Sequence, residues 1–544
     1  MTRTHTIGTL AAIGGLTATI ALLTGLPAAN ADELADLRAN QELLQRRIDQ
    51  LAQGQPPAAG GIPGGGPGSA LGAQPIPGQA IIGGSFPRSF LIPGTDTSIR
   101  VGGFIDITGN YFFQGANSGN PGIPTSNFGQ NGNLNGVPVG QQFVPGLGNV
   151  PQQANHSRGN GFFEFSPQQS RLNVETRTPT AWGESRTFME FDWSGSNTFS
   201  AQTVQQAGGD SLLPRLRFAY GTLGGFLAGQ AISNFSDADA DTESMEFGGA
   251  MGSTGGARIP QVRYTLAGPY GSAFSVSAEQ PTVGVETPGG LFTNDSNTGG
   301  LPGGPGTGAI GPICNGVPCT GAGTAVNGNI AKSIAPNVAF ASYWAQPWGH
   351  VDFAGVLVPM QFNDGHFISR DYLGYGGHFS GDVKPGWFGW AKDDFLFSIV
   401  VGEGIGYYTS GGWANAAAMS TNFTVATACA TPQPGCTGGM AASNVLFKQN
   451  FAYSTNGGYQ HWWSPTLRST IAAGIAQQDL SSKLIGPTQA STFTKEQWNA
   501  FANLVWNPVA FITAGIQYNY GTRVVVANGK GNAQAISAKF RVAF

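Results

Sequence analysis

From Ser98 to the last residue, hydrophobic and polar positions alternate in short segments bounded by Gly, Asn and Pro. A period of two places neighbouring side chains on opposite faces of an extended strand. The last segment has one apolar face (Ala538, Phe540, Val542, Phe544) and one polar face (Ser537, Lys539, Arg541). The pattern predicts an all-β chain with one greasy and one hydrophilic face to each strand.

Sixteen segments of this kind begin near residues 98, 170, 185, 214, 225, 259, 272, 335, 350, 372, 394, 445, 466, 496, 510 and 533. Connections after odd-numbered segments are mostly long, such as 116–169, 232–258, 281–332 and 409–444, whereas those after even-numbered segments are mostly tight, such as TLG and NPVA. An even strand count with alternating long loops and short turns is typical of bacterial transmembrane barrels. We therefore expect a 16-stranded antiparallel, porin-like β-barrel.

The composition supports a membrane location. Only 10% of the residues are charged and 11% are aromatic, against roughly 25% charged residues in soluble domains. Beyond residue 31 no apolar run reaches the roughly 18 to 20 residues of a membrane helix, so a closed barrel is the remaining way to span a bilayer. A soluble β-sandwich or barrel is the alternative, and the net charge of -4 gives no reason to expect nucleic acid as a partner.

The N-terminus resembles an export signal. Arg3 precedes the apolar stretch 13–26, and Ala29-Asn30-Ala31 fits a signal-peptidase site. Residues 1–31 are thus predicted to be a signal peptide and the outer membrane of a Gram-negative bacterium to be the destination. An uncleaved anchor is the alternative.

Residues 32–53 carry a short heptad pattern, with Leu34, Leu37, Leu44, Ile48 and Leu51 at a and d positions. It predicts a periplasmic α-helical coiled coil, or else a solvated spacer. Residues 54–97 are a Gly- and Pro-rich linker and lead-in, followed by the barrel at 98–544.

Four cysteines lie in two close pairs, Cys314 with Cys319 and Cys429 with Cys436. In an oxidising compartment they suit two small loop disulfides. Zinc binding is a weaker alternative because neither pair has CxxC spacing, so no metal or other cofactor is expected.

Charged residues recur on one face of adjacent segments: Arg171, Glu175, Arg177, Arg186, Glu190, Asp192, Arg215, Arg217 and Arg263. A lipid-facing arginine near the bilayer midplane costs about 2 to 4 kcal/mol, so these side chains are expected to line the pore. Phe218 and Tyr220 then fall on the opposite, lipid face. The arginines either contact solute or brace the wall by pairing with the acids.

The segments PGTDTSIRVGGFIDI, SRLNVETRTPTAWG, FMEFDW, LRFAYGTLGGFLAGQ and RIPQVRYT resemble the DcaP-like family of trimeric outer-membrane porins. The resemblance implies a homotrimer and uptake of small dicarboxylates or aromatic acids through an arginine-lined constriction. Carried over by position, the binding residues are Arg171, Arg177, Arg215, Arg217 and Arg263. The cysteine pairs and the large loops 116–169 and 281–332 depart from the pattern.

The third long connection is acidic, with Asp237, Asp239, Asp241, Glu243 and Glu246. In general porins the third loop folds into the barrel, which predicts a constriction where these acids face the arginines and orient solutes by a transverse field. A solvated acidic loop and a weak calcium site are alternatives, although the spacing lacks the Gly and Glu of an EF-hand.

These features predict a passive porin for small hydrophilic, preferentially anionic solutes, surrounded by outer-membrane lipid. Catalysis is not expected, because the six histidines are scattered and no serine lies in a recognisable catalytic motif. A structural tether or adhesin is the stronger alternative function. A helix that contacts peptidoglycan would be compatible with a porin and with a tether.

Overall fold

The computed structural model describes residues 83–114, 141–144, 148–151, 161–195, 213–245, 249–252, 258–281, 284–287, 290–293, 313–314, 317–318, 331–332, 334–363, 369–409, 417–419, 447–480 and 494–544. They belong to one compact unit, Ala80–Phe544. The predicted signal peptide, the coiled coil and most of the linker lie outside the described residues.

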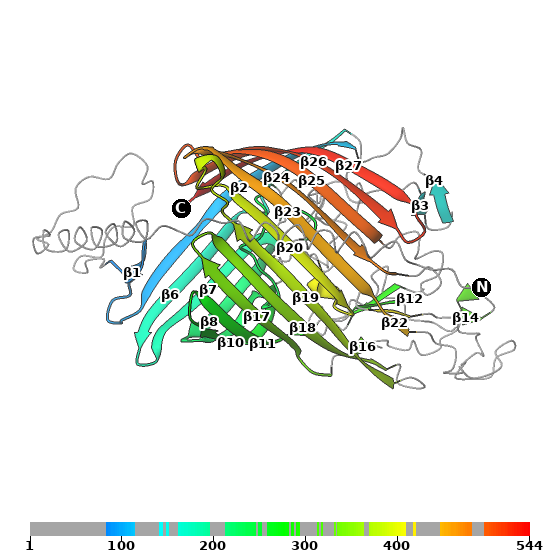
Figure 1. Ribbon diagram of the computed structural model, residues 1–544, viewed down its shortest axis with the longest axis horizontal. Coiled ribbons are helices and arrows are strands. Elements are labelled where there is room, and N and C mark those ends of the chain that lie inside the picture. Colours follow the sequence, from blue (N-terminus) through cyan, green and yellow to red (C-terminus); the bar gives the residue numbers. More distant parts are fainter. Residues whose placement is uncertain are drawn as a thin grey trace, which may run out of the picture. The chain divides into compact units, whose positions relative to one another are not determined.

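Sixteen antiparallel strands form a closed barrel (Figure 1). They are β2 (Ser98–Gln114), β6 (Arg171–Thr180), β7 (Gly183–Gly195), β8 (Leu213–Leu223), β9 (Phe226–Ile232), β10 (Arg258–Ala267), β11 (Ser272–Glu279), β17 (Asn337–Gln346), β18 (Gly349–Asn363), β19 (Ser369–Val383), β20 (Asp394–Glu403), β23 (Phe451–Ser464), β24 (Leu467–Gln478), β25 (Thr494–Trp506), β26 (Ile512–Val525) and β27 (Lys530–Ala543).

The first barrel strand closes the ring. One edge of β2 pairs with β6 from Ser98 to Phe104, and the other edge pairs with β27 from Phe104 onward. Every other barrel strand pairs with its sequence neighbours, so the backbone bonds form a continuous belt with no free edge. A bilayer demands such closure because hydrocarbon offers no hydrogen-bond partners.

The predicted strands are confirmed closely. Fifteen of the sixteen begin within three residues of the expected position. The exception is β23, which starts at Phe451 instead of near 445, because Phe447–Gln449 (β22) pairs with β21 (Ala417–Met419) in a separate small sheet.

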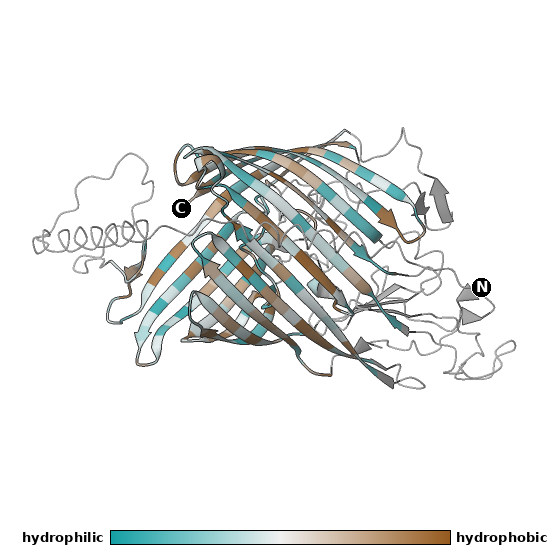
Figure 2. Ribbon diagram, in the orientation of Figure 1, coloured by the Kyte–Doolittle hydropathy of each residue, from teal (hydrophilic) through white to brown (hydrophobic). Residues whose placement is uncertain are grey.

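Alternation along the strands separates two environments. On β2, Val101, Ile105 and Ile107 are exposed on the outer face, whereas Asp106 and Thr108 are buried on the inner face. Figure 2 shows the same alternation as bands of apolar and polar residues across the barrel. The outer face is therefore built for lipid and the inner face for water and polar contacts.

Short accessory strands complete the described chain. Phe90–Leu91 (β1) and Phe162–Ser166 (β5) pair with β2, and Ala331–Lys332 (β16) pairs with β18. Pairs of two- to four-residue strands lie in the long connections: Gln141–Val144 (β3) with Gly148–Pro151 (β4), Gly284–Thr287 (β12) with Gly290–Thr293 (β13), and Ile313–Cys314 (β14) with Val317–Pro318 (β15). The helical elements described are the 3-10 turns η1 (Trp387–Gly389) and η2 (Gly406–Tyr408). Within the described residues no helix has the length and apolar character to cross a membrane.

The outer face of β2 can be tested at Ile105, whose side chain is 63% exposed. Replacing it by arginine, Ile105→Arg, is expected to lower the free energy of unfolding by about 2 to 4 kcal/mol, because a cation then faces hydrocarbon. Denaturant unfolding in lipid vesicles measures the loss, and Ile105→Leu is the matched control. Equal stability of the two variants contradicts a lipid-facing position.

Candidate functional site

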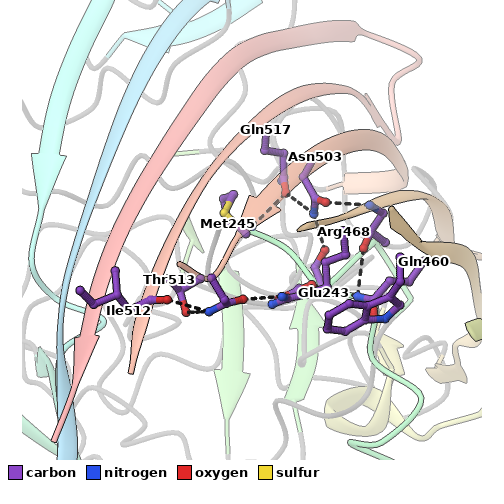
Figure 3. Close-up of polar contacts among 11 residues, drawn as sticks. Glu243, Met245, Gln460, Arg468, Asn503, Ile512, Thr513 and Gln517 are labelled. Atoms are coloured by element: carbon purple, nitrogen blue, oxygen red, sulfur yellow. Dashed lines mark hydrogen bonds and ion pairs between the residues drawn. The ribbon is translucent and has the colours of Figure 1, made fainter. Parts of the chain in front are cut away.

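The connection between β9 and β10, described over 233–245 and 249–252 and here called the inward loop, turns into the barrel. It docks on the inner faces of β18, β19 and β23 to β26. Glu243 binds the Arg468 guanidinium through both carboxylate oxygens (2.6 and 2.5 Å) and accepts a hydrogen bond from Gln460 (2.8 Å). The Met245 amide donates to Gln517 Oε1 (2.9 Å), as Figure 3 shows together with the Glu243 contacts.

Glycines in the wall make room for the inward loop. A Cβ at Gly474 would overlap the carbonyl oxygen of Met251, and a Cβ at Gly515 would overlap the Met245 sulfur. The Met251 amide donates to Asn499 Oδ1 at 2.7 Å. The loop is thus seated by backbone contact as well as by charge.

A second anchor lies on β18 and β19. Asp237 accepts hydrogen bonds from His350 Nε2 and Ser380 Oγ, both at 2.8 Å, and the other His350 ring nitrogen contacts Asp382. Burial raises the pKa of the Asp237 carboxyl, but the hydrogen bond and charge of His350 lower it by more, so the pKa lies below the usual aspartate range. Asp237 is therefore a carboxylate at neutral pH.

The acids of the inward loop thus divide by position. Asp237 and Glu243 point to the wall formed by β18, β19 and β24, where Glu243 binds Arg468, and not across to the predicted arginine row on β6, β7, β8 and β10. Asp239 is exposed and Asp241 half-buried. Glu246 lies outside the described residues.

One group of ionic side chains lies near the short turns and is called here the turn-end cluster: Arg100, Arg177, Arg186, Glu175 and Glu184. Glu175 is almost fully buried and binds Arg100 (2.5 Å), Arg177 (2.8 Å) and Arg186 (2.7 Å). Three guanidinium groups around one carboxylate offset the cost of burying it.

A second group lies at the height where the inward loop leaves the wall. This central cluster comprises Arg171, Arg215, Arg217, Arg258, Lys539, Arg541, Asp106, Glu190 and Asp192. Arg217 is 4% exposed and bridges Glu190 and Asp192, both at 2.8 Å. Six basic groups face three acidic ones, an excess of three positive charges on one side of the lumen.

The structure corrects the predicted facing of Phe218 and Tyr220. The pairing of β7 with β8 shifts between Glu190 and Phe191, so that Glu190 lies opposite Phe218 and Phe191 opposite Leu216. This β-bulge reverses the alternation after Arg217 and turns both rings into the lumen. Tyr220 accepts a hydrogen bond from the inward-facing Arg186 (3.3 Å).

Three aromatic rings pack together between the turn-end cluster and the central cluster. Phe188, Phe218 and Tyr220 have centroids 5.7 to 6.3 Å apart. Arg186 lies 5.5 Å from the Phe188 centroid and Arg258 lies 6.0 Å from that of Phe218. Arg263 is near Tyr220, and its Nε is buried without a hydrogen-bond partner among the described atoms.

Sequence reasoning missed several contributors: Arg258, Arg468, Lys539, Arg541, Arg100 and His350. Lys539 and Arg541 were already assigned to the polar face of the last strand, so their lumen position was available. Arg258 has no such signal. It is the first residue of β10, where simple alternation assigns it to the lipid face, yet its side chain reaches inward to the Phe218 ring.

The predicted disulfides stay predictions. Cys314 lies in β14, whereas Cys319, Cys429 and Cys436 lie outside the described residues. The described part of the chain contains no group of three or more His, Cys, Asp or Glu side chains arranged to hold a metal ion.

Comparisons with known proteins agree with this architecture. The family model of the Porin subfamily matches residues 88–540. Among solved structures, the outer membrane channel DcaP of Acinetobacter baumannii is similar, with 18% identity, a TM-score of 0.56 and coverage of 85% of this chain and 100% of that one. An anion-selective porin from Comamonas acidovorans has 8% identity, a TM-score of 0.43 and coverage of 82% and 100%. No curated protein matches.

The seat of the inward loop predicts the effect of a single methyl group. Gly474→Ala is expected to force the Met251 carbonyl away from β24, since overpacking of this kind costs about 1 to 3 kcal/mol and the loop relieves it by moving. Single-channel recording should show a larger conductance. Gly457→Ala on β23, where a Cβ meets only the Leu396 carbonyl at 3.7 Å, is the control. A conductance equal to that of the control argues against a seated loop.

Proposed function

This chain belongs to the Porin subfamily, and from that premise we propose that it is an outer-membrane channel that favours small anions over cations during passive diffusion. The channel role follows from the family and the closed barrel. The preference for anions is the finer proposal. Its main support is the excess of three positive charges in the central cluster, at the height where the inward loop leaves the wall.

The arginines of the central cluster do not contribute equally. Arg217 is buried between Glu190 and Asp192, so it braces the wall, and its removal leaves two acids poorly compensated. Arg258 forms no ion pair within the described residues, and its neighbours Arg215 and Arg217 add to the positive field around it. We therefore propose Arg258 and Arg263 as the main contacts for a solute carboxylate, which a guanidinium fork binds through two hydrogen bonds.

The inward loop supports a polarised constriction in a modified form. Its exposed Asp239 is the acid that we propose faces the arginines, whereas Asp237 and Glu243 hold the loop. A solute that crosses the proposed constriction then meets positive charge on β6, β8, β10 and β27 and an amide-rich wall on β25 and β26.

The partners follow from the family resemblance. We propose a homotrimer in outer-membrane lipid, with dicarboxylates or aromatic acids as solutes and the N-terminal helix in the periplasm, in reach of peptidoglycan. A structural tether or adhesin is the alternative, because a helix joined to a barrel with large loops also describes an envelope anchor. A purified protein that inserts into bilayers without conductance favours the tether.

The anion preference is tested by Arg258→Gln. Removing this charge is expected to lower the anion-to-cation permeability ratio, because the field at the constriction loses an uncompensated positive charge. The reversal potential of the channel in a planar bilayer under a salt gradient measures the ratio. Swelling of liposomes in mono- and dicarboxylates gives a second readout, with slower uptake of dianions.

Lys448→Gln is the matched control. It removes the same charge from an exposed lysine that pairs with Asp479 away from the central cluster. If both variants shift the reversal potential equally, general surface charge explains the selectivity and the constriction does not.

A further inference from the structure

The segment that leads into the barrel places an aromatic ring against the turn-end cluster. Gly83 and Phe90 form an antiparallel bridge, and the turn between them carries Phe86, which is only 7% exposed. The Cζ atoms of Arg177 and Arg100 lie 4.6 and 5.5 Å from its ring centroid. Both guanidinium groups come from the inner face of the wall, so the ring covers them at the short-turn end of the lumen.

Hydrogen bonds hold this turn in shape. The Ser85 amide donates to Ser98 Oγ (2.9 Å), the Gly84 amide donates to the Ser89 carbonyl (3.0 Å), and the Ser89 amide donates to the Phe86 carbonyl (3.1 Å). Arg88 adopts a left-handed backbone with φ of 61°. The position of the ring is therefore set by a built turn and not by chance contact of a loose segment.

The barrel does not need this turn for closure. The turn joins the sheet through β1, which pairs with β2 at only two positions, Phe90 with Ile99 and Leu91 with Ser98. The barrel is already closed by the pairing of β6 and β27 with the two edges of β2. Residues 83–91 can thus leave the wall while the sixteen strands stay paired.

The covered cluster carries an excess of positive charge. Three arginines surround Glu175 and Glu184, and Glu184 is half exposed at 3.4 Å from Arg177. Phe86 shields the guanidinium faces of Arg100 and Arg177 that the carboxylates leave open. Without the Phe86 ring, the guanidinium groups of Arg100 and Arg177 would be exposed to water at the short-turn end of the lumen.

We propose that Phe86 is a specificity-determining residue of the channel, which covers a second anion site at the short-turn end, and that residues 83–91 form the lid of this site. The site would take small carboxylates and inorganic anions through Arg100 and Arg177. This inference rests on the proposed channel function, but it uses residues distinct from the central cluster.

The test is Phe86→Ala in the full-length protein, recorded in planar bilayers under a potassium chloride gradient. The anion-to-cation permeability ratio is expected to rise about 2- to 5-fold, the size that the loss of one weak cation–π contact supports. Phe86→Trp keeps the ring and should resemble the unmodified channel. Phe90→Ala removes an exposed ring from the same segment and is the matched control.

A double variant, Phe86→Ala with Arg177→Gln, should abolish the gain. An unchanged reversal potential in Phe86→Ala, with Arg258→Gln still effective, overturns the lid and leaves the anion constriction standing. Absence of conductance in the unmodified protein overturns both. Should Phe86→Ala not fold, Phe86→Val, which removes most of the ring but keeps an apolar side chain in the turn, must still raise the ratio for the lid to hold.

Discussion

Hydrogen-bond closure around β2 is the constraint on which the rest of the molecule depends. In hydrocarbon an unpaired backbone amide costs several kcal/mol, so a sheet that spans the bilayer must have no edge. Pairing with β6 on one side and β27 on the other removes that edge. Once the barrel is closed, each strand has one face toward lipid and one toward the lumen. The polar side chains must then lie on the lumen face.

The lumen wall combines bracing with electrostatics. Glu175 and Asp192 are buried, and each is held by two or more arginines, so their removal or that of their partners would leave uncompensated charge inside the protein. The acids are nevertheless outnumbered, and the surplus guanidinium groups create the field. In the function proposed above, one lattice therefore stabilises the barrel and attracts anions, with Arg217 nearer the first role and Arg258 nearer the second.

Much of the barrel could be predicted because a period of two is strict. The strand starts, the lumen facing of Arg171, Glu175 and Arg177, and the entry of the third connection into the barrel all follow from alternation or from the family. The docking of Glu243 on Arg468 joins residues more than two hundred positions apart and leaves no local signal. The facing of Phe218 and Tyr220 was predicted wrongly because parity counting assumes an unbroken register, and one bulged residue violates that assumption.

Because of that β-bulge, the number of residues in β8 affects which side chains face the lumen, independently of which residues they are. The alternation of inward and outward side chains on β8 changes register once, between Arg217 and Phe218. Deletion of Arg217, the extra residue of the bulge, would place Phe218 directly after the outward-facing Leu216, so both rings would stay on the lumen face while the lumen loses one cation. In a family of barrels, single-residue gaps in a strand can therefore change what a channel admits as much as substitutions do.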